Sequence, residues 1–600
     1  LNQKQKRRNN MIQDKGSNYQ FYNHTEKANV QKSVFDLSFL NTTTINNGGE
    51  IIPLGWFETV PGDKFSINFE AMIRVMPQVI PLFSRQRLFI HAYWSRTIEL
   101  WNDAETYYDK GYTGNVALKK PTISSDNFDA TLWNSGNGTV TAGSLADYLE
   151  LPIGAKYSEL QKSGVSALPF MMYERIYKEY YMNPNYYTEN RQWLPHDDGD
   201  LRLNTDGEII SVKNNPDIPA GQEDISFGKI HYRDWTQDYF TSALPWPQRG
   251  TAKQLATQAT FEDNAVYMNG YNENGEQITH DKTAIFNYVQ PNGGTRFVNT
   301  QNGHFVQLGT GTTALMGTAL GTPEGPSGGE TTANKIFLET VGTTQILTGI
   351  NANDLRELFL NQQELETMAR TDGSYAQFGL AFFGEVSKAA KSYKPQYIGG
   401  TYQNITFGEV LQNAPSTGEG VSPLGSFAGR GGMTTQGDLG TIYCDDYGII
   451  MICASIVPDT YYSQGVERKW TRQIQEDEYL PDRAKLGMQP ILNEELVFEN
   501  GKEVQNKDVW AWQNRFDELR YTTNKIHGKI ADPSAASFYP YTQARHFSDL
   551  PGYSQEFALM DDVRKDYLTS TAEVAYLMQS AIKIRAVRPL PYKAIPAELI

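Results

Sequence analysis

The chain has 600 residues and a formal net charge of -16, from 53 basic and 69 acidic side chains. Hydrophobic residues make up 39% of it and charged residues 20%, which excludes a disordered chain. The negative charge excludes a protein that coats nucleic acid unaided, because such proteins are strongly basic. At about 150 residues per domain, length alone predicts roughly four domains.

The amino-acid composition favours β-structure, and the low number of cysteines favours folding in a reducing compartment. The 35 Tyr, 28 Phe and 10 Trp, with 51 Gly, are typical of β-sheets joined by many turns. Two Cys exclude a disulfide framework. We expect Cys444 and Cys453 to be buried free thiols; the alternative is a pair facing each other across a hairpin. No apolar run reaches the 18 or so residues of a membrane helix.

Residues 1–32 are polar and predict an extended arm. Its basic side chains precede the first acid, Asp14, and no apolar segment follows that would make a secretory signal. Basic tails of this kind neutralise phosphates without reading sequence, so the arm is a candidate nucleic-acid contact; a merely solvated tail is the alternative. The candidate contacts are Lys4, Lys6, Arg7 and Arg8.

Two strands are predicted next. Residues 65–75 alternate with period two, with Phe65, Ile67, Phe69, Ala71, Ile73 and Val75 on the buried face. Residues 87–95 form a second strand that is apolar or aromatic on both faces, and Pro77 and Pro81 preclude a helix between the two.

The middle of the chain differs in composition. Residues 100–250 are irregular, and 251–350 are acidic and rich in glycine, with eight Gly between 301 and 330. Such a stretch in a compact protein is a functional surface insertion or is disordered.

Regular elements are predicted again after residue 350. Residues 353–370 read as a helix capped by Asn353, with Leu355, Leu358, Phe359, Leu365 and Met368 on its apolar face. Residues 441–444 and 449–457 read as a hairpin around the turn 445–448. Residues 581–587 alternate, with Ile582 and Ile584 inward, and a proline-rich tail follows. The best strands thus lie near both ends and no linker separates domains, which favours one β-barrel with large loop insertions over four serial domains.

Catalytic and metal-binding patterns are weak. The eight His show no metal-ligand spacing, so we expect no zinc site and no cofactor. Asp197, Asp198 and Asp200 are candidate calcium ligands, but they lack the full EF-hand spacing, which favours a solvated loop. No phosphate loop or nucleophile elbow is complete. Paired carboxylates remain, because glycosidases need only two. The candidates are Asp445, Asp446, Asp561 and Asp562, near Trp193, Trp235, Trp246 and Trp470, and turn acids with buried aromatics are the simpler interpretation.

Several segments, in this order, resemble the major capsid proteins of tailless icosahedral single-stranded DNA phages, the Microviridae. They are SVFDLSFLN (33–41), VPGD (60–63), DWTQDYFTSALPWPQRG (234–250), NDLR (353–356), GGT (399–401), YYSQG (461–465), LGMQ (486–489), WQNRF (512–516), SFYPYTQAR (537–545) and RPLP (588–591). The stretch HAYWSRTIELW (91–101) departs from the family's usual continuation, and the length resembles gokushovirus-like or related branches.

The resemblance implies an all-β fold, an eight-stranded jelly-roll barrel with long loop insertions and a few helices. We expect a basic arm at 1–32, the first part of the barrel at 33–250, a surface insertion forming a protrusion at 251–350, the second part at 351–587 and an extended tail at 588–600.

The function implied is structural, with no catalytic residue. We expect sixty copies to form a T=1 shell around circular single-stranded DNA, assembled in the host bacterial cytoplasm, with a small basic DNA-binding protein, other minor virion proteins and a host surface glycan or receptor as partners. The alternative is an aromatic-rich β-protein that acts on or binds glycans.

Overall fold

The computed structural model describes residues 30–101, 103–110, 114, 118–122, 139–186, 230–250, 352–371, 375–385, 394–411, 427–535, 537–571 and 574–593, with five short strands between 267 and 339. The chain divides into two compact units, Leu1–Gly250 with Leu365–Ile600, and Thr251–Glu364.

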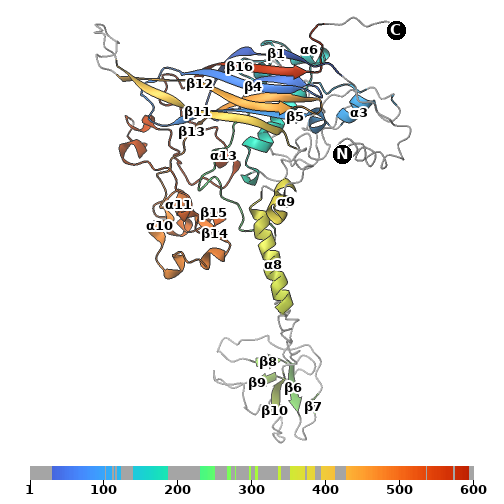
Figure 1. Ribbon diagram of the computed structural model, residues 1–600. Helices are drawn as coiled ribbons and strands as arrows, with labels where there is room; N and C mark the ends of the chain where they lie inside the picture. The colour runs from blue at the N-terminus through green and yellow to red at the C-terminus, as the bar shows by residue number, and fades with distance from the viewer. Residues whose placement is uncertain are drawn as a thin grey trace, which may run out of the picture. The chain divides into compact units, whose positions relative to one another are not determined.

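A large antiparallel sheet dominates the first unit (Figure 1). Its strands are β1 (Ser33–Asp36), β2 (Phe39–Ile45), β3 (Ile52–Thr59), β4 (Lys64–Val75), β5 (Gln86–Arg96), β11 (Gln396–Leu411), β12 (Phe427–Tyr443), β13 (Gly448–Pro458) and β16 (Tyr576–Arg588). The order is β1-β16-β4-β12-β11-β5-β13-β3, and β2 also pairs with β16.

This order is that of a jelly roll. Strands β1, β2, β16, β4 and β12 lie in one half of the path and β11, β5, β13 and β3 in the other. Among these strands the chain therefore changes halves six times, after β2, β3, β4, β11, β12 and β13. β1 pairs with residues 585–588 of β16 and β2 with 576–582, so the two together form one edge strand. Eight strand positions result, and the predicted eight-stranded jelly-roll class is confirmed.

The core lies between the two halves. All six predicted inward residues of β4 are buried in it, together with Trp94 of β5 and Ile450 and Ile452 of β13. The outward face of β4 carries polar side chains such as Glu70, which pairs with Lys583 of β16. The predicted inward orientation of Ile582 and Ile584 is confirmed as well.

The hairpin predicted at 441–457 is wrong. β12 pairs with β4 and β11, whereas β13 pairs with β5 and β3, so the turn 445–448 carries the chain from one half to the other. Local turn signals do not show which strand is the partner, because the pairing is set by the whole barrel. The apolar run of β13 is buried along its entire length because it has a core on each face.

The two cysteines are free and buried, as predicted. Cys444 lies in the core between the halves, whereas Cys453 faces the second core, on the other side of β13. Burial raises the pKa of the Cys444 thiol to about 12 and raises that of Cys453 as well.

Helices occur in the long loops. The loop after β5 holds α2 (Thr97–Leu100), α3 (Ala104–Asp109), α5 (Leu145–Tyr148), α6 (Tyr157–Lys162), α7 (Leu168–Ile176), the π-helix η1 (Tyr177–Tyr181), α8 (Ala352–Ala369) and α9 (Tyr375–Phe383). The loop after β13 holds α10 (Arg468–Thr471), β14 (Met488–Leu492), α11 (Asn493–Leu496), α12 (Glu503–Asn506), β15 (Val509–Asn514) and α13 (Gln555–Ala558). Short 3-10 turns connect several of them.

The predicted helix at 353–370 is confirmed as α8, with two corrections. Asn353 lies inside the helix and does not cap it, since the helix begins at Ala352. Phe359, assigned to the apolar face, is largely exposed in the single chain.

The second unit contains two small antiparallel sheets. Their strands are β6 (Tyr267–Tyr271), β7 (Gln277–Ile278) and β10 (Lys335–Glu339) in the order β10-β6-β7, and β8 (Arg296–Val298) paired with β9 (Phe305–Gln307). The boundary with the first unit falls within α8.

Candidate functional site

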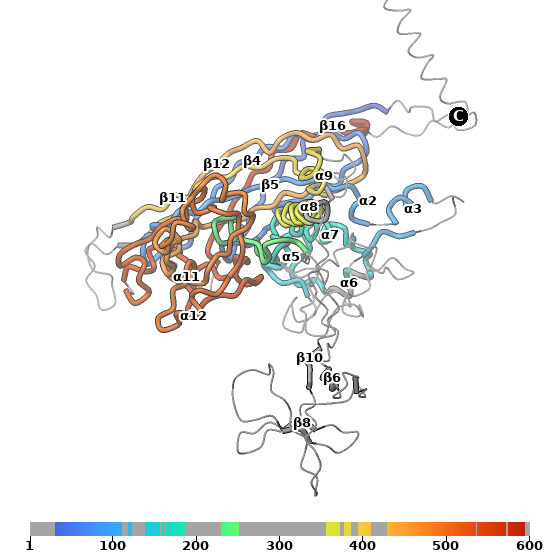
Figure 2. The backbone as a smooth tube through the Cα atoms, turned by 90° about the horizontal axis from the view of Figure 1, so that it is seen from below, coloured from blue at the N-terminus to red at the C-terminus, as the bar shows by residue number. Residues whose placement is uncertain are grey.

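The loop after β5 covers the outer face of the β5–β13 half and builds a second core there. α7 is buried along its length and packs against this face, with α5 beside it (Figure 2). The core contains Tyr93 of β5 and Met451 of β13 as well as the helices. Around α5 and α7 the loop is therefore a fixed layer on the barrel. This layer positions the side chains described below.

Aromatic side chains continue across the same face to β11. Tyr397 and Tyr402 of β11 lie opposite Tyr93 and Phe89 of β5. Between them, Gly400 lies opposite His91, and a Cβ at that position would lie 2.4 Å from the imidazole. Burial and the nearby Arg233 lower the pKa of His91 to about 4, so its ring is neutral at physiological pH.

A buried hydrogen-bonded contact between His231 and Glu174 holds the end of α7. Nε2 of His231 lies 2.8 Å from Oε2 and 2.9 Å from Oε1 of Glu174, and the imidazole stacks on Tyr177 at 4.1 Å. The hydroxyl of Tyr173 donates to the carbonyl of Ile51 and accepts from the amide of His231. These bonds hold His231 in place, and the segment that follows it lines a pocket from Arg233 onward.

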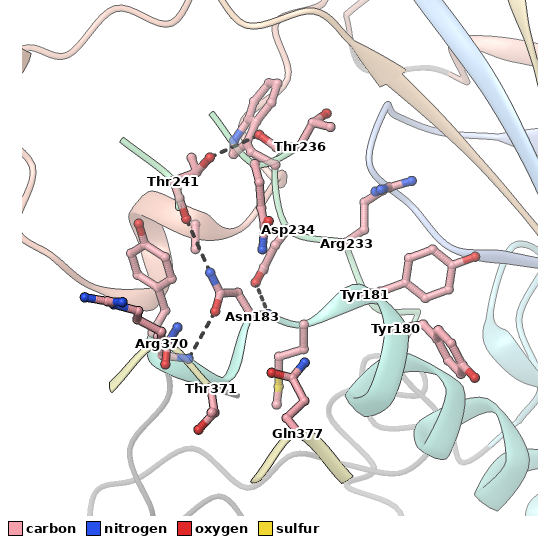
Figure 3. Close-up of a pocket in the computed structure, with 16 residues that line it drawn as sticks. Tyr180, Tyr181, Asn183, Arg233, Asp234, Thr236, Thr241, Arg370, Thr371 and Gln377 are labelled. Atoms are coloured by element: carbon pink, nitrogen blue, oxygen red, sulfur yellow. Dashed lines mark hydrogen bonds between the residues drawn. The ribbon is translucent and has the colours of Figure 1, made fainter. Parts of the chain in front are cut away.

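A pocket of about 470 Å³ opens beside this layer. Four parts of the chain line it: the end of η1 with the residues that follow it, the segment after Ile230, the end of α8 with the start of α9, and α13. The lining residues are Tyr180–Asn183, Asn185, Tyr186, Arg233–Gln237, Thr241, Arg370, Thr371, Gln377 and Ala558. Figure 3 shows Asn183 at its centre, between Asp234 and Thr371, with Tyr180 on one side and Arg370 on the other. A π-helix such as η1 is frequent at functional sites.

Hydrogen bonds hold the centre of the pocket in place. The amide of Asn183 donates to Oδ2 of Asp234 at 2.6 Å, and its side chain donates to the carbonyl of Thr241 at 3.3 Å. The hydroxyl of Thr241 donates to the carbonyl of Thr236 at 3.0 Å. The pocket is thus a shaped, polar cavity of the size that binds small ligands.

The loop after β13 forms a further module around β14 and β15. Its core includes Phe240, Trp510 and Phe557, and the buried Glu495 accepts from the hydroxyl of Tyr239 at 2.7 Å. Burial raises the pKa of Glu495. Large apolar side chains remain exposed on the module, among them Trp470, which is 76% exposed. Exposed apolar groups of this size mark contact surfaces when they are contiguous.

The structure places some of the residues singled out from the sequence. Asp445 and Asp446 lie in the turn after β12, where Arg96 pairs with Asp445 at 3.0 Å. Asp561 and Asp562 are exposed in the loop before β16. Lys4, Lys6, Arg7, Arg8, Trp193, Asp197, Asp198 and Asp200 lie outside the described residues. Within the described part of the chain, no group of His, Cys, Asp and Glu has the arrangement of a metal site, and no helix has the length and apolarity to cross a membrane.

Sequence reasoning did not find the pocket. From the sequence, residues 234–250 indicated only a resemblance to the capsid family. Trp235 was predicted only to lie near possible catalytic carboxylates. The lining residues come from segments up to hundreds of positions apart, so no motif or spacing joins them.

An eight-stranded jelly roll with long structured loops is an architecture of viral coat and lectin domains. The chain belongs to the family described as Capsid protein (F protein), whose model matches residues 24–597. Three curated relatives are each 24% identical to it and are each called Capsid protein VP1. That of Chlamydia phage 1 aligns with 96% of this chain and 97% of its own length, that of Bdellovibrio phage phiMH2K with 88% of each, and that of Spiroplasma virus 4 with 86% and 85%. The protein is a structural capsid protein, a component of a phage virion.

Proposed function

We propose that this capsid protein assembles into a T=1 icosahedral shell of sixty identical copies around a circular single-stranded DNA genome. The observation that carries the proposal is the family match over residues 24–597, which spans the barrel and its loops. The exposed apolar side chains of the first unit, such as Phe83 and Trp470, supply surface that neighbouring copies would bury. The role is structural and involves no turnover.

Sedimentation and negative-stain microscopy of the purified full-length chain test the proposal. Closed shells of uniform diameter are expected. A stable small monomer under all conditions would contradict it and would favour the alternative, a β-protein that acts on or binds glycans.

The packaged DNA contacts the basic arm in this proposal, through Lys4, Lys6, Arg7 and Arg8. The chain's net charge of -16 means that other cations, including a small basic DNA-binding protein among the minor virion proteins, neutralise most of the phosphates. Deletion of residues 1–10 should lower DNA content per particle. Unchanged DNA content and particle yield would remove the arm from the proposal.

The segment 251–350 is proposed to be a surface protrusion that contacts a host glycan or receptor, carried by barrel segments 33–250 and 351–587 with a tail at 588–600. Its acidic, glycine-rich composition suits an exposed insertion. A variant without the segment should form shells that adsorb poorly to host cells; normal adsorption would contradict the role. The two free thiols support assembly in the reducing host cytoplasm.

A further inference from the structure

Strands β11 and β12 run on past the rest of the sheet as a two-stranded hairpin (Figure 1). Residues 406–411 of β11 pair with residues 427–432 of β12. The pairing of β11 with β5 ends at Ile405, and that of β12 with β4 begins at Gly432. A hairpin of two strands alone is marginally stable in water, so this extension needs further strands at its edges.

The two edges of the extension differ. On the β12 edge, the amide of Gln78 donates to the carbonyl of Gly429 at 3.4 Å, and the amide of Gly429 donates to the carbonyl of Gln78 at 3.2 Å. On the β11 edge, no strand in the described part of the chain pairs with residues 406–411. Thr406, Gly408 and Glu409 are exposed. Every second residue along this edge directs its backbone N–H and carbonyl away from β12, where they can bind another strand.

Three other edge strands of the first unit are covered or short. The edge of β3 faces β2, whose Asn41 donates from its side-chain amide to the carbonyl of Leu54 at 2.6 Å. At the edge of β15, Trp512 and Leu244 exchange two backbone hydrogen bonds. Strand β1 has only four residues. The open edge at residues 406–411 therefore has its best-matched partner in the same edge of a second copy.

We propose that residues 406–410 of β11 pair antiparallel with the same residues of a second copy, about a twofold axis that passes between the two copies of Gly408. The inference rests on the proposed icosahedral shell, whose symmetry includes twofold axes, and it names a contact made there. Such an interface is isologous, so one edge serves both copies. The pairing makes a continuous sheet of four strands, β12-β11-β11-β12, and supplies the strand that each hairpin lacks.

Backbone geometry requires a central residue in this pairing. Along a strand, successive residues direct their N–H and carbonyl groups to opposite sides. Residues that lie opposite each other in an antiparallel pair direct these groups either both toward the partner strand or both away from it. In two identical strands the opposed positions therefore differ by an even number, and one residue lies opposite its own copy.

Charge and overlap select Gly408 as that residue. A centre at Glu409 would place two carboxylates opposite each other, which is unfavourable. A centre at Phe407 would leave only three residues of each strand to pair, because Ile405 already pairs with β5. A centre at Gly408 pairs five residues of each strand and places Glu409 opposite Phe407.

Disulfide cross-linking of the assembled full-length chain tests the pairing. In Gly408→Cys the two Cα atoms would lie about 4.5–5.5 Å apart, which a disulfide can bridge. The side chain is accommodated, since the atom nearest to a Cβ at this position is the carbonyl oxygen of Arg430 at 3.9 Å. After oxidation with glutathione disulfide, the band on a non-reducing gel should shift from 67.6 kDa to twice that mass. The native Cys444 and Cys453 are buried and should not contribute.

Gln403→Cys is the matched control, because Gln403 is also exposed on β11 but lies where this strand pairs with β5. It should remain monomeric on the gel. Glu409→Cys should remain monomeric too, because residue 409 lies diagonally from its own copy, with Cβ atoms about 7–8 Å apart. The double variant Thr406→Cys/Val410→Cys places thiols at another directly opposed pair. It should cross-link and decides the question if Gly408→Cys does not fold.

Three results would overturn the proposal. They are shells of Gly408→Cys that stay monomeric on the gel, equal cross-linking of Gly408→Cys and Gln403→Cys, and cross-linking of Glu409→Cys in preference to Gly408→Cys. Microscopy of the same preparations keeps this test separate from that of the shell. Cross-linked dimers that form no shells would contradict only the proposed assembly, and shells without cross-linked dimers would contradict only the pairing.

Discussion

Arg588 binds the carboxylate of Asp63 with Nη2 at 2.9 Å and Nε at 3.1 Å, although the two residues are 525 positions apart. Asp63 is fully buried in the turn before β4, and its carboxylate also accepts from the amide of Val60 at 3.0 Å. Arg588 ends β16. The ion pair therefore joins the first and last parts of the barrel, at two of the segments on which the resemblance to capsid proteins rests.

Removal of this arginine should destabilise the barrel strongly. In Arg588→Ala the carboxylate of Asp63 stays buried without its cation, which costs about 3 kcal/mol of unfolding free energy. Chemical denaturation followed by tryptophan fluorescence measures the loss. Arg585→Ala is the control, because Arg585 lies exposed on the same strand and should change stability by less than about 0.5 kcal/mol. Equal stability of the two variants would show that the ion pair does not hold the barrel closed.

Replacement of two glycines of β11 by alanine should change the stability of the fold by different amounts. A Cβ at Gly399, at the bulge opposite Ala92, would lie 2.2 Å from the carbonyl oxygen of Leu439, and this backbone atom cannot move aside cheaply. We expect Gly399→Ala to lose about 1–3 kcal/mol through overpacking. At Gly408 the nearest atom would be the carbonyl oxygen of Arg430 at 3.9 Å, so Gly408→Ala should be tolerated. Thermal unfolding compares the two, and a lower melting temperature for Gly408→Ala than for Gly399→Ala would contradict the close packing at the bulge.

Stability should fall as the pH is lowered from about 6.5 toward 4. The pKa of His91 is lowered from 6.5 to about 4, first by burial and then by the charge of Arg233. Between these values the unfolded chain binds a proton at this site that the folded chain does not, so folding loses stability as pH decreases. Between pH 7 and pH 5 the loss from this residue is about 2 kcal/mol.

The variant His91→Gln isolates this contribution, since other buried groups titrate too; burial raises the pKa of Glu50 and Glu495, for example, which acts in the opposite direction. Denaturation at pH 7 and pH 5 should show a pH-dependent loss that is about 2 kcal/mol smaller in His91→Gln than in the parent. His527→Gln, at an exposed histidine, should retain the parent's pH dependence. An equal dependence in His91→Gln and the parent would refute the assignment to His91.

The thiols should be inert in the folded chain. Burial raises the pKa of Cys444 to about 12 and that of Cys453 likewise, so neither forms a thiolate at neutral or mildly alkaline pH. A chromogenic disulfide reagent should release no thiol colour from the folded chain and should titrate both cysteines after denaturation. Rapid reaction of one thiol before unfolding would mean that its strand opens locally.

The strand β4 was readable from the chain because its signal is local. Its side chains alternate between a core face and an exposed face. The spacing of Phe65, Ile67 and Phe69 therefore predicts a half-buried strand even when its partner strands are unknown. The same holds for Ile582 and Ile584 of β16 and for the helix α8. The barrel class followed from where these segments fall along the chain and from the resembling segments around them.

Local sequence signals could not predict which strands pair with one another. The turn at Asp445 has the local chemistry of a hairpin, yet β12 and β13 belong to different halves of the barrel, because pairing depends on strands far away in the sequence. The pocket at Asn183 lay beyond prediction for the same reason, since Tyr180, Asp234 and Arg370 meet only when the loop after β5 packs on the barrel.

The sequence by itself determined that this protein is a β-rich capsid subunit with two buried free thiols, because composition, alternation and the order of short segments are properties of the chain. Only the tertiary structure decided that Asp63 meets Arg588, that Cys444 and Cys453 face different cores, and that a polar pocket forms beside Tyr180. The physical reason is that these features arise from contacts between distant segments, whose geometry is set by closure of the barrel and not by local propensity.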